Sequence, residues 1–316
     1  MLEASQTPRS GWRAAAGRIG PIAARVLRPG ARGSVRAVFE RSFYVELDTG
    51  WAAIGAAGLG AGPLVLECEG WPPGCHGLGC QGLGCRGLGC HGPALPAVLR
   101  AGDVARVDAT RLAAGEVAIT LDGAAPWAPA RLGAWDTASL GRGLAAADAA
   151  LVRLAPCDGL ALLAAGDGFQ RAALLAAAQA PLAHLAQLVG QRTAAAPIDA
   201  ARLAPLIGLG PGLTPSGDDY LSGLFVALSL VGRRRLRDRL WQAVEPLTVA
   251  RTTAISRAHL AAAAEGLGSA ALHDALAAIL SGATARVAAA CAGLARLGHT
   301  SGWDGLAGAL SVLRHT

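Results

Sequence analysis

The first third of the chain alternates apolar and polar residues in short runs. Between Val35 and Leu47 every odd position except Arg41 is apolar, and charged or hydroxyl residues recur between them. A period of two is typical of a half-buried β-strand, with a break expected near Arg41. Asp48-Thr49-Gly50 predicts a turn, and residues 51–54 would return as a hairpin. Further short strands are predicted at 64–66, 104–107 and 117–121.

After Trp135 the pattern changes to long runs of alanine and leucine, interrupted by single glycine or proline residues. Runs of this length with short connections are typical of helices. The predicted helices span 140–154, 168–190, 199–207, 217–231, 234–245, 247–264, 268–281, 283–297 and 301–314.

These patterns predict an α+β protein, with a small, mostly β domain at residues 34–130 and a larger all-helical domain at 135–316. The first 33 residues are rich in arginine and contain Glu3 as their only carboxylate. We expect them to form a disordered extension. No apolar segment of a secretory signal is present there, which favours a cytoplasmic protein.

Composition narrows the class of protein. Of the 316 residues, 53% are hydrophobic, which excludes a disordered chain. The net charge is +6, but the arginines are scattered, and no aromatic residues interleave with the dense run at 233–239. This pattern does not favour nucleic-acid binding. The apolar segment 172–191 contains histidine, proline and glutamine, so it predicts a buried or amphipathic helix and no membrane span.

Four of the seven cysteines recur every five residues, at Cys75, Cys80, Cys85 and Cys90. Zinc sites bring their ligands in close pairs, so this repeat, a loop at residues 74–92, is more typical of a duplicated coding segment than of a metal site. We expect the other cysteines, Cys68, Cys157 and Cys291, to be core residues.

Polar residues gather in "GLGPGLTPSGDDYLSG", residues 208–223, ahead of an apolar helical face. Ser216 as N-cap with Asp219 three residues later would form a capping box. Thr214 followed by Pro215 is a competing start. Capping leaves Asp218 and the glycine-rich approach unexplained.

A second polar segment, "GHTSGWDGLAGAL" at 298–310, repeats the first as S-G-x-D-x-L-x-G. A hydroxyl residue precedes each serine, and a glycine follows seven residues after it. We expect the two helix starts to meet in space, where free backbone N–H groups would bind an anion or a polar carbonyl compound. The aspartates would repel a bare phosphate. Either a Mg²⁺ ion bridges them to the phosphate, or the ligand carries amide N–H groups, as carbamoyl or oxamate groups do.

A third polar segment, "ARTTAISRAHL" at 250–260, places Arg251 in an otherwise apolar predicted helix. Such an arginine needs a carboxylate or phosphate partner, which is either an internal aspartate or a ligand. Thr252 and Ser256 would otherwise bond to backbone carbonyls. His299 is either a structural histidine or a proton-transfer group.

In that order, "GLGPGLTPSGDDYLSG", "RTTAIS" and "GHTSGWDGLAG" resemble the AllH-like family, over roughly residues 34–314. The resemblance implies a subunit of oxamate carbamoyltransferase, which would convert oxalurate and phosphate to oxamate and carbamoyl phosphate beside other transferase subunits. A non-catalytic scaffold or ligand-sensing subunit is the alternative.

The candidate catalytic residues are Asp218, Asp219, Asp304 and His299. The candidate substrate-binding residues are Gly210, Gly212, Thr214, Ser216, Gly217, Arg251, Thr252, Thr253, Ser256, Thr300 and Ser301. No resident metal or cofactor is predicted beyond the Mg²⁺ alternative.

Overall fold

The computed structural model describes residues 12–71, 98–156, 158–161, 169–191 and 197–316. The chain divides into two compact units, Met1–Ala128 and Pro129–Thr316. The first is built mainly of strands and the second of helices, so the predicted α+β class is confirmed.

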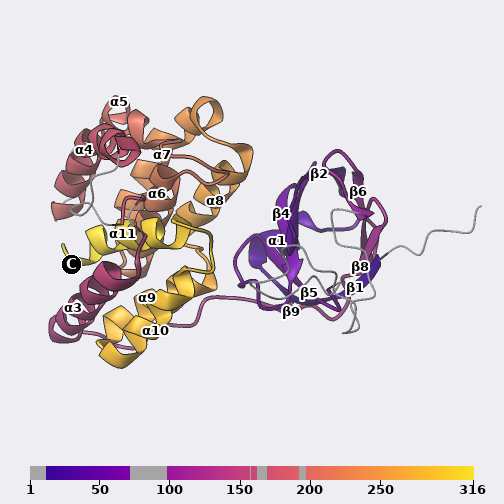
Figure 1. The fold of residues 1–316 in the computed structure, drawn as a ribbon, viewed down its shortest axis with the longest axis horizontal. Coiled ribbons are helices and arrows are strands. Elements are labelled where there is room, and N and C mark those ends of the chain that lie inside the picture. Colours follow the sequence, from indigo (N-terminus) through magenta and orange to yellow (C-terminus); the bar gives the residue numbers. More distant parts are fainter. Residues whose placement is uncertain (1–11, 72–97, 157, 162–168, 192–196) are drawn as a thin grey trace, which may run out of the picture. The chain divides into compact units, whose positions relative to one another are not determined.

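In the described part of the first unit, eight strands close into a barrel (Figure 1). Around the barrel they follow the order β5–β4–β3–β2–β6–β7–β8–β1, and β1 pairs with β5 to complete the ring. Closure removes the open edges of the sheet. The bounds are β1 Trp12–Ile19, β2 Arg32–Val38, β3 Ser42–Leu47, β4 Gly50–Ala56, β5 Val65–Glu69, β6 Val104–Val107, β7 Arg111–Ala114 and β8 Val117–Thr120, with β9 (Ala125–Pro126) beside β1.

The predicted strand pair and hairpin are confirmed. Phe43, Val45 and Leu47 are buried, and the residues between them in β3 are partly exposed. β3 then turns into β4 with Leu47 opposite Gly50, whose φ of +129° favours glycine.

The N-terminal region differs from the prediction. Residues 12–33 are ordered as β1, the short helix α1 (Pro21–Val26) and the start of β2, so the disordered extension was wrong for them. β1 is rich in alanine and arginine and lacks a strong strand pattern. Its conformation depends on pairing with β5 on one side and with β8 on the other. Residues 1–11 and the cysteine repeat at 74–92 lie outside the described residues.

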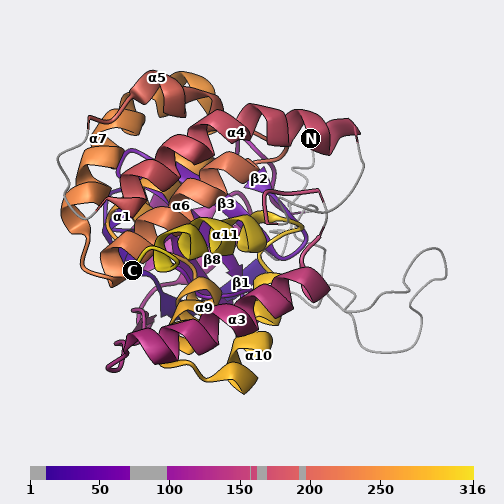
Figure 2. The same ribbon diagram turned by 90° about the vertical axis from the view of Figure 1, so that its left-hand side faces the viewer.

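The helical unit contains α3 (Thr137–Leu154), α4 (Phe169–Gly190), α5 (Ala200–Leu203), the 3-10 turn η1 (Ala204–Leu206), α6 (Ser216–Leu230), α7 (Arg234–Arg251), α8 (Ala254–Ala264), α9 (Ala270–Ser281), α10 (Thr284–Leu294) and α11 (Ser301–Leu313). The predicted break near residue 246 was wrong, because Pro246 lies inside α7 and the break falls at Thr252-Thr253. Within this unit α6 and α11 lie side by side, with α3, α9 and α10 on one side and α4, α5 and α7 on the other (Figures 1 and 2).

In the described part of the chain, one helix is long and apolar enough to cross a membrane by length and composition. It is the segment Ala173–Gly190 of α4, a third of which (33%) is buried. Leu185, Leu188 and Val189 of this segment belong to the hydrophobic core of the helical unit. Packing therefore accounts for part of its apolar character.

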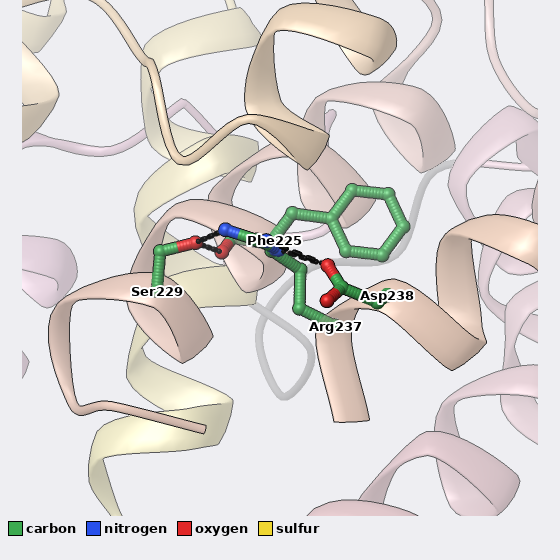
Figure 3. Close-up of polar contacts among 4 residues, drawn as sticks. All are labelled: Phe225, Ser229, Arg237 and Asp238. Atoms are coloured by element: carbon green, nitrogen blue, oxygen red, sulfur yellow. Dashed lines mark hydrogen bonds and ion pairs between the residues drawn. The ribbon is translucent and has the colours of Figure 1, made fainter. Parts of the chain in front are cut away.

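A polar network fixes the C-terminal end of α6 against α7 (Figure 3). Arg237 donates from Nη1 to Ser229 Oγ at 2.8 Å, and Ser229 Oγ donates to the Phe225 carbonyl at 2.9 Å. The Arg237 guanidinium also contacts Asp238 Oδ1 at 2.6 and 2.9 Å. These contacts hold α6 at the end opposite to its polar start.

Candidate functional site

The two serine-glycine segments meet in the structure. Thr214 Oγ1 and Ser301 Oγ are 3.0 Å apart, although 87 residues separate them in the chain. The first side chain directly precedes α6, and the second begins α11. The prediction that these two helix starts lie together is therefore confirmed.

Glycine residues allow this close approach. A Cβ atom on Gly223 of α6 would lie 1.7 Å from the carbonyl oxygen of Gly305, and one on Gly308 of α11 would lie 1.9 Å from that of Tyr220. Neither distance leaves room for a side chain, so the two helices touch backbone to backbone. Both glycines occupy the same place in the repeated motif, seven residues after the serine.

The contacts between the helices are reciprocal. The hydroxyl of Ser301 in α11 lowers the pKa of Asp219 in α6, and the hydroxyl of Ser216 in α6 lowers the pKa of Asp304 in α11. The same pairs of motif positions therefore interact in both directions. The two helix starts thus form an approximate two-fold arrangement, which we call the paired corners: Thr214, Ser216, Asp219, Thr300, Ser301 and Asp304.

Asp219 and Asp304 each carry a buried oxygen with no partner among the described residues, namely Oδ2. The Asp304 side chain is 0% exposed, and its Oδ1 accepts a hydrogen bond from the Leu160 N–H at 2.6 Å. Buried acceptors without a partner are uncommon and costly in folded proteins. Both oxygens can therefore still accept a hydrogen bond or a proton.

Burial raises the pKa of both carboxyl groups. For Asp304 it raises the pKa to about 6, against the opposing effect of donors that include Ser216 and Leu160. For Asp219 the pKa lies well above its usual value, mainly through burial, with a smaller rise from the negative charge of Asp304. The hydroxyls of Ser301 and Thr214 act in the opposite direction.

Asp218 has a different role from the one predicted. Its Oδ1 accepts from the Gly208 N–H at 2.8 Å, and its Oδ2 accepts from Ser256 Oγ at 2.6 Å and from the Thr252 hydroxyl. The side chain is 1% exposed. This carboxylate joins the loop before α6 to the start of α8, and these bonds make it a positioning group.

The third polar segment is also used internally. Thr252 and Ser256 bond to Asp218 instead of to backbone carbonyls. Thr253 caps α8 by accepting from the Ser256 N–H at 3.0 Å, and its hydroxyl donates to the Leu213 carbonyl at 2.5 Å. These residues therefore connect the start of α8 to Asp218 and to the loop before α6.

Among the described residues, Arg251 makes a backbone contact and no contact with an aspartate. It ends α7, its side chain is exposed, and its Nη1 donates to the Ala204 carbonyl at 3.2 Å. Its own carbonyl oxygen lies against Gly208, where a Cβ would approach to 1.9 Å. The prediction that Arg251 lies inside a helix was wrong, because α7 ends at this residue and α8 begins at Ala254.

The predicted capping box was also wrong. Ser216 and Ser301 are the first residues of their helices, and the cap positions are Pro215 and Thr300, neither of which makes a side-chain cap bond. The serine hydroxyls are instead directed across to the facing helix.

The glycine-rich approach to α6 is required by its backbone. Gly208, Gly210 and Gly212 have φ angles of +73°, +109° and +97°, which residues with side chains rarely adopt. A Cβ on Gly210 would lie 3.0 Å from Ser216 N. Gly217 is among the predicted substrate-binding residues. In the structure its N–H donates to the Leu209 carbonyl at 2.9 Å, so this N–H is already used within the chain.

A loop that the sequence did not point to completes the site. Gly159 lies against Asp304, with its Cβ position 2.5 Å from Oδ1, and Leu160 supplies the backbone donor. His299 Nε2 lies 2.9 Å from Asp158 Oδ2 in an exposed pair at the edge of this loop. Asp158-Gly159 signals a turn between helices, but nothing in it predicts contact with α11.

Metal ligands are sparse in the region described. No group of three or more His, Cys, Asp or Glu side chains suited to a metal ion occurs among these residues. Burial raises the pKa of Cys68 to about 12 and that of Cys291 to about 11, as expected for core cysteines, and Cys157 lies outside the described residues. The Mg²⁺ alternative stays a prediction.

Comparison with known proteins points to one family. A family model described as oxamate carbamoyltransferase subunit AllH matches residues 206–313. The match contains all three polar segments but is shorter than the predicted 34–314, because the barrel and the helices before residue 206 lie outside it. No curated protein and no solved structure matches the chain.

Proposed function

We propose, from the match of residues 206–313 to the family model described as oxamate carbamoyltransferase subunit AllH, that the chain is a subunit of a carbamoyltransferase that converts oxalurate and phosphate to oxamate and carbamoyl phosphate. The family description names a subunit, which implies other subunits in a complex. Within this subunit, the paired corners of α6 and α11 would bind the carbamoyl-bearing substrate.

The observation that carries the proposal is the pair of buried, unpartnered carboxylate oxygens of Asp219 and Asp304. A carbamoyl or oxamate group offers N–H donors to such acceptors. Its carbonyl oxygens can accept from neighbouring hydroxyls such as those of Thr214 and Ser301, which already contact each other at 3.0 Å. A ligand of this kind would remove the cost of leaving the carboxylate oxygens unpaired.

The electrostatics disfavour a bare anion at the paired corners. The charges acting on Asp219 are those of Asp304 and Asp218, both negative. Arg251 points elsewhere, to the Ala204 carbonyl. The phosphate would therefore depend on a cation from outside the paired corners, either Mg²⁺ or a basic group of another subunit, while this chain orients the amide end of the substrate.

The first prediction tests the proposed activity in the reconstituted complex. Wild-type chain mixed with its partner subunits is expected to form carbamoyl phosphate from oxalurate and phosphate. Ser301→Ala should lower kcat/KM by about ten- to a hundred-fold, because a hydroxyl that orients substrate and faces Asp219 is lost. Ser281→Ala, an exposed serine at the end of α9, is the matched control and should leave the rate unchanged.

Calorimetry separates this proposal from the scaffold alternative. The isolated chain is titrated with oxamate, with oxalurate and with carbamoyl phosphate. Heat of binding that Ser301→Ala weakens supports a substrate-binding subunit. Absence of binding by the isolated chain, together with a stable complex and full activity of Ser301→Ala, would leave a scaffold as the better description.

A further inference from the structure

Asp219 and Asp304 are equivalent positions of the repeated motif, and each is the fourth residue of its helix. Because the helices cross with glycine at both contacts, the two side chains are brought to one place in the core of the helical unit. Asp304 Oδ1 accepts from the Leu160 N–H, and the hydroxyls of Ser301 and Thr214 act on Asp219. Each also has one buried oxygen, Oδ2, without a partner in the described structure.

Two adjacent buried carboxyl groups are difficult to ionise together. Removing a charge from water is costly, and a neighbouring like charge adds to the cost. Both effects act here: burial is the main cause of the raised pKa of Asp219, and the charge of Asp304 raises it further. Both carboxyl groups therefore retain a proton to higher pH than an exposed aspartate does, and for Asp304 the pKa is raised to about 6.

Among the described residues, the charges that act on Asp219 are both negative, those of Asp304 and Asp218. On α6, Asp218 adds negative charge near Asp219. On α8, which packs against α6, burial lowers the pKa of His259 to about 4, so its ring is neutral at pH 7. On α9, burial likewise lowers the pKa of His273 to about 4. At the start of α11, His299 is turned to Asp158 at the exposed rim.

We propose that Asp219 and Asp304 share a single proton and act as the acid–base pair of carbamoyl transfer, an inference that rests on the proposed function. The unpartnered Oδ2 atoms mark where the pair meets the reacting groups. One carboxyl is neutral and can donate, and the other is ionised and can accept. General acid–base catalysis needs both forms close together at the working pH.

The proposed reaction conserves the single proton of the pair. A hydrogenphosphate oxygen attacks the carbamoyl carbon of oxalurate and forms the new C–O bond. The bond from that carbon to the nitrogen of the oxamate portion then breaks. This nitrogen takes the proton of the neutral carboxyl and leaves as the amide of oxamate. The proton of hydrogenphosphate passes to the ionised carboxylate, which restores the one-proton state.

The shared proton is tested without any activity measurement. Carboxyl groups of the full chain, labelled with ¹³C at aspartate, are titrated by NMR from pH 4 to pH 9. One buried carboxyl is expected to remain protonated at pH 7. In Asp304→Asn the titration of Asp219 should move to lower pH, because the neighbouring charge is gone. Asp148→Asn, an exposed aspartate on α3, is the control and should change neither signal.

Two results of this titration would overturn the inference. The first is ionisation of both carboxyl groups below pH 5 in the folded chain. The second is loss of the shared proton on addition of MgCl₂ alone, which would make the pair a metal site. Thermal unfolding of each variant shows whether the fold is kept.

Activity of the reconstituted complex tests the role of the pair in the reaction. Asp219→Asn and Asp304→Asn should each lower kcat by a factor of about 10²–10⁴ and remove one limb of the bell-shaped pH profile. An active wild-type complex with unchanged profiles in both variants would overturn the acid–base role. A wild-type complex without carbamoyltransferase activity would instead overturn the proposed function, while the NMR titration would still decide whether the proton is shared.

Discussion

At the scale of single residues, the three aspartates at the starts of α6 and α11 have two kinds of surroundings. Asp218 uses its oxygens fully, on Gly208, Thr252 and Ser256. Asp219 and Asp304 retain a buried oxygen each. A fully bonded carboxylate stabilises the fold, whereas a buried and incompletely bonded one costs stability. The sequence places all three at a helix start, and only their partners distinguish them.

Asp304→Asn is predicted to stabilise the protein at neutral pH. The pKa of Asp304 is raised to about 6 from a usual value of 3.8, so its contribution to stability is fully present below pH 4. That contribution is lost as the pH rises through 6. The variant should unfold with a free energy higher by up to roughly 3 kcal/mol at pH 7, and the difference should shrink to nothing by pH 4.

Urea titrations at a series of pH values measure this difference. Asp218→Asn is the comparator and should be destabilising at pH 7, since three donors lose a charged acceptor. A pH-independent effect of Asp304→Asn would contradict the raised pKa.

At the scale of elements, the central feature is the contact between α6 and α11. Its closeness depends on Gly223 and Gly308, and both lie in the repeated motif. The same contact brings Thr214 to Ser301 and Asp219 to Asp304. The contact between α6 and α11 therefore brings the two sequence motifs together into one site.

Gly223→Ala is predicted to lower the free energy of unfolding by about 1–3 kcal/mol, because its Cβ would lie 1.7 Å from the Gly305 carbonyl oxygen. Gly141→Ala in α3 is the matched control, since a Cβ there has no neighbour within 4 Å. It should stabilise by about 0.5–1 kcal/mol through helix propensity. Chemical denaturation measures both, and equal effects would show that the helix contact tolerates a side chain.

At the scale of the whole molecule, the barrel and the helical unit have separate hydrophobic cores. One core runs from Ala16 to Ile119 and the other from Leu140 to Leu313, without a shared residue. All residues of the paired corners lie in the second unit. Units with their own cores are expected to fold independently.

Residues 129–316 expressed alone are therefore predicted to unfold in one cooperative thermal transition. The heat of oxamate binding to this fragment should equal that of the full chain. Circular dichroism and calorimetry measure these properties, with residues 1–128 as the companion fragment. A helical fragment that is unfolded in isolation would show that the barrel is needed for its stability.

Local sequence patterns determined the elements of this protein because they depend on near neighbours. The period of two in β3, the helical runs after Trp135 and the repeated S-G-x-D-x-L-x-G motif could all be predicted. The match of residues 206–313 to the AllH family model agrees with the motif order.

Contacts between distant segments were decided only by the tertiary structure. Closure of the barrel by β1 and β5, and the Leu160 N–H that bonds to Asp304, leave no periodic signal in the chain. The same holds for the choice of Asp218 as a positioning group, since its partners Thr252 and Ser256 lie more than 30 residues away. An aspartate has the same side chain wherever it occurs in the chain. The fold determines its burial and its hydrogen-bond donors, and these decide whether the carboxylate stabilises the structure or keeps an oxygen free to bind a proton or a ligand.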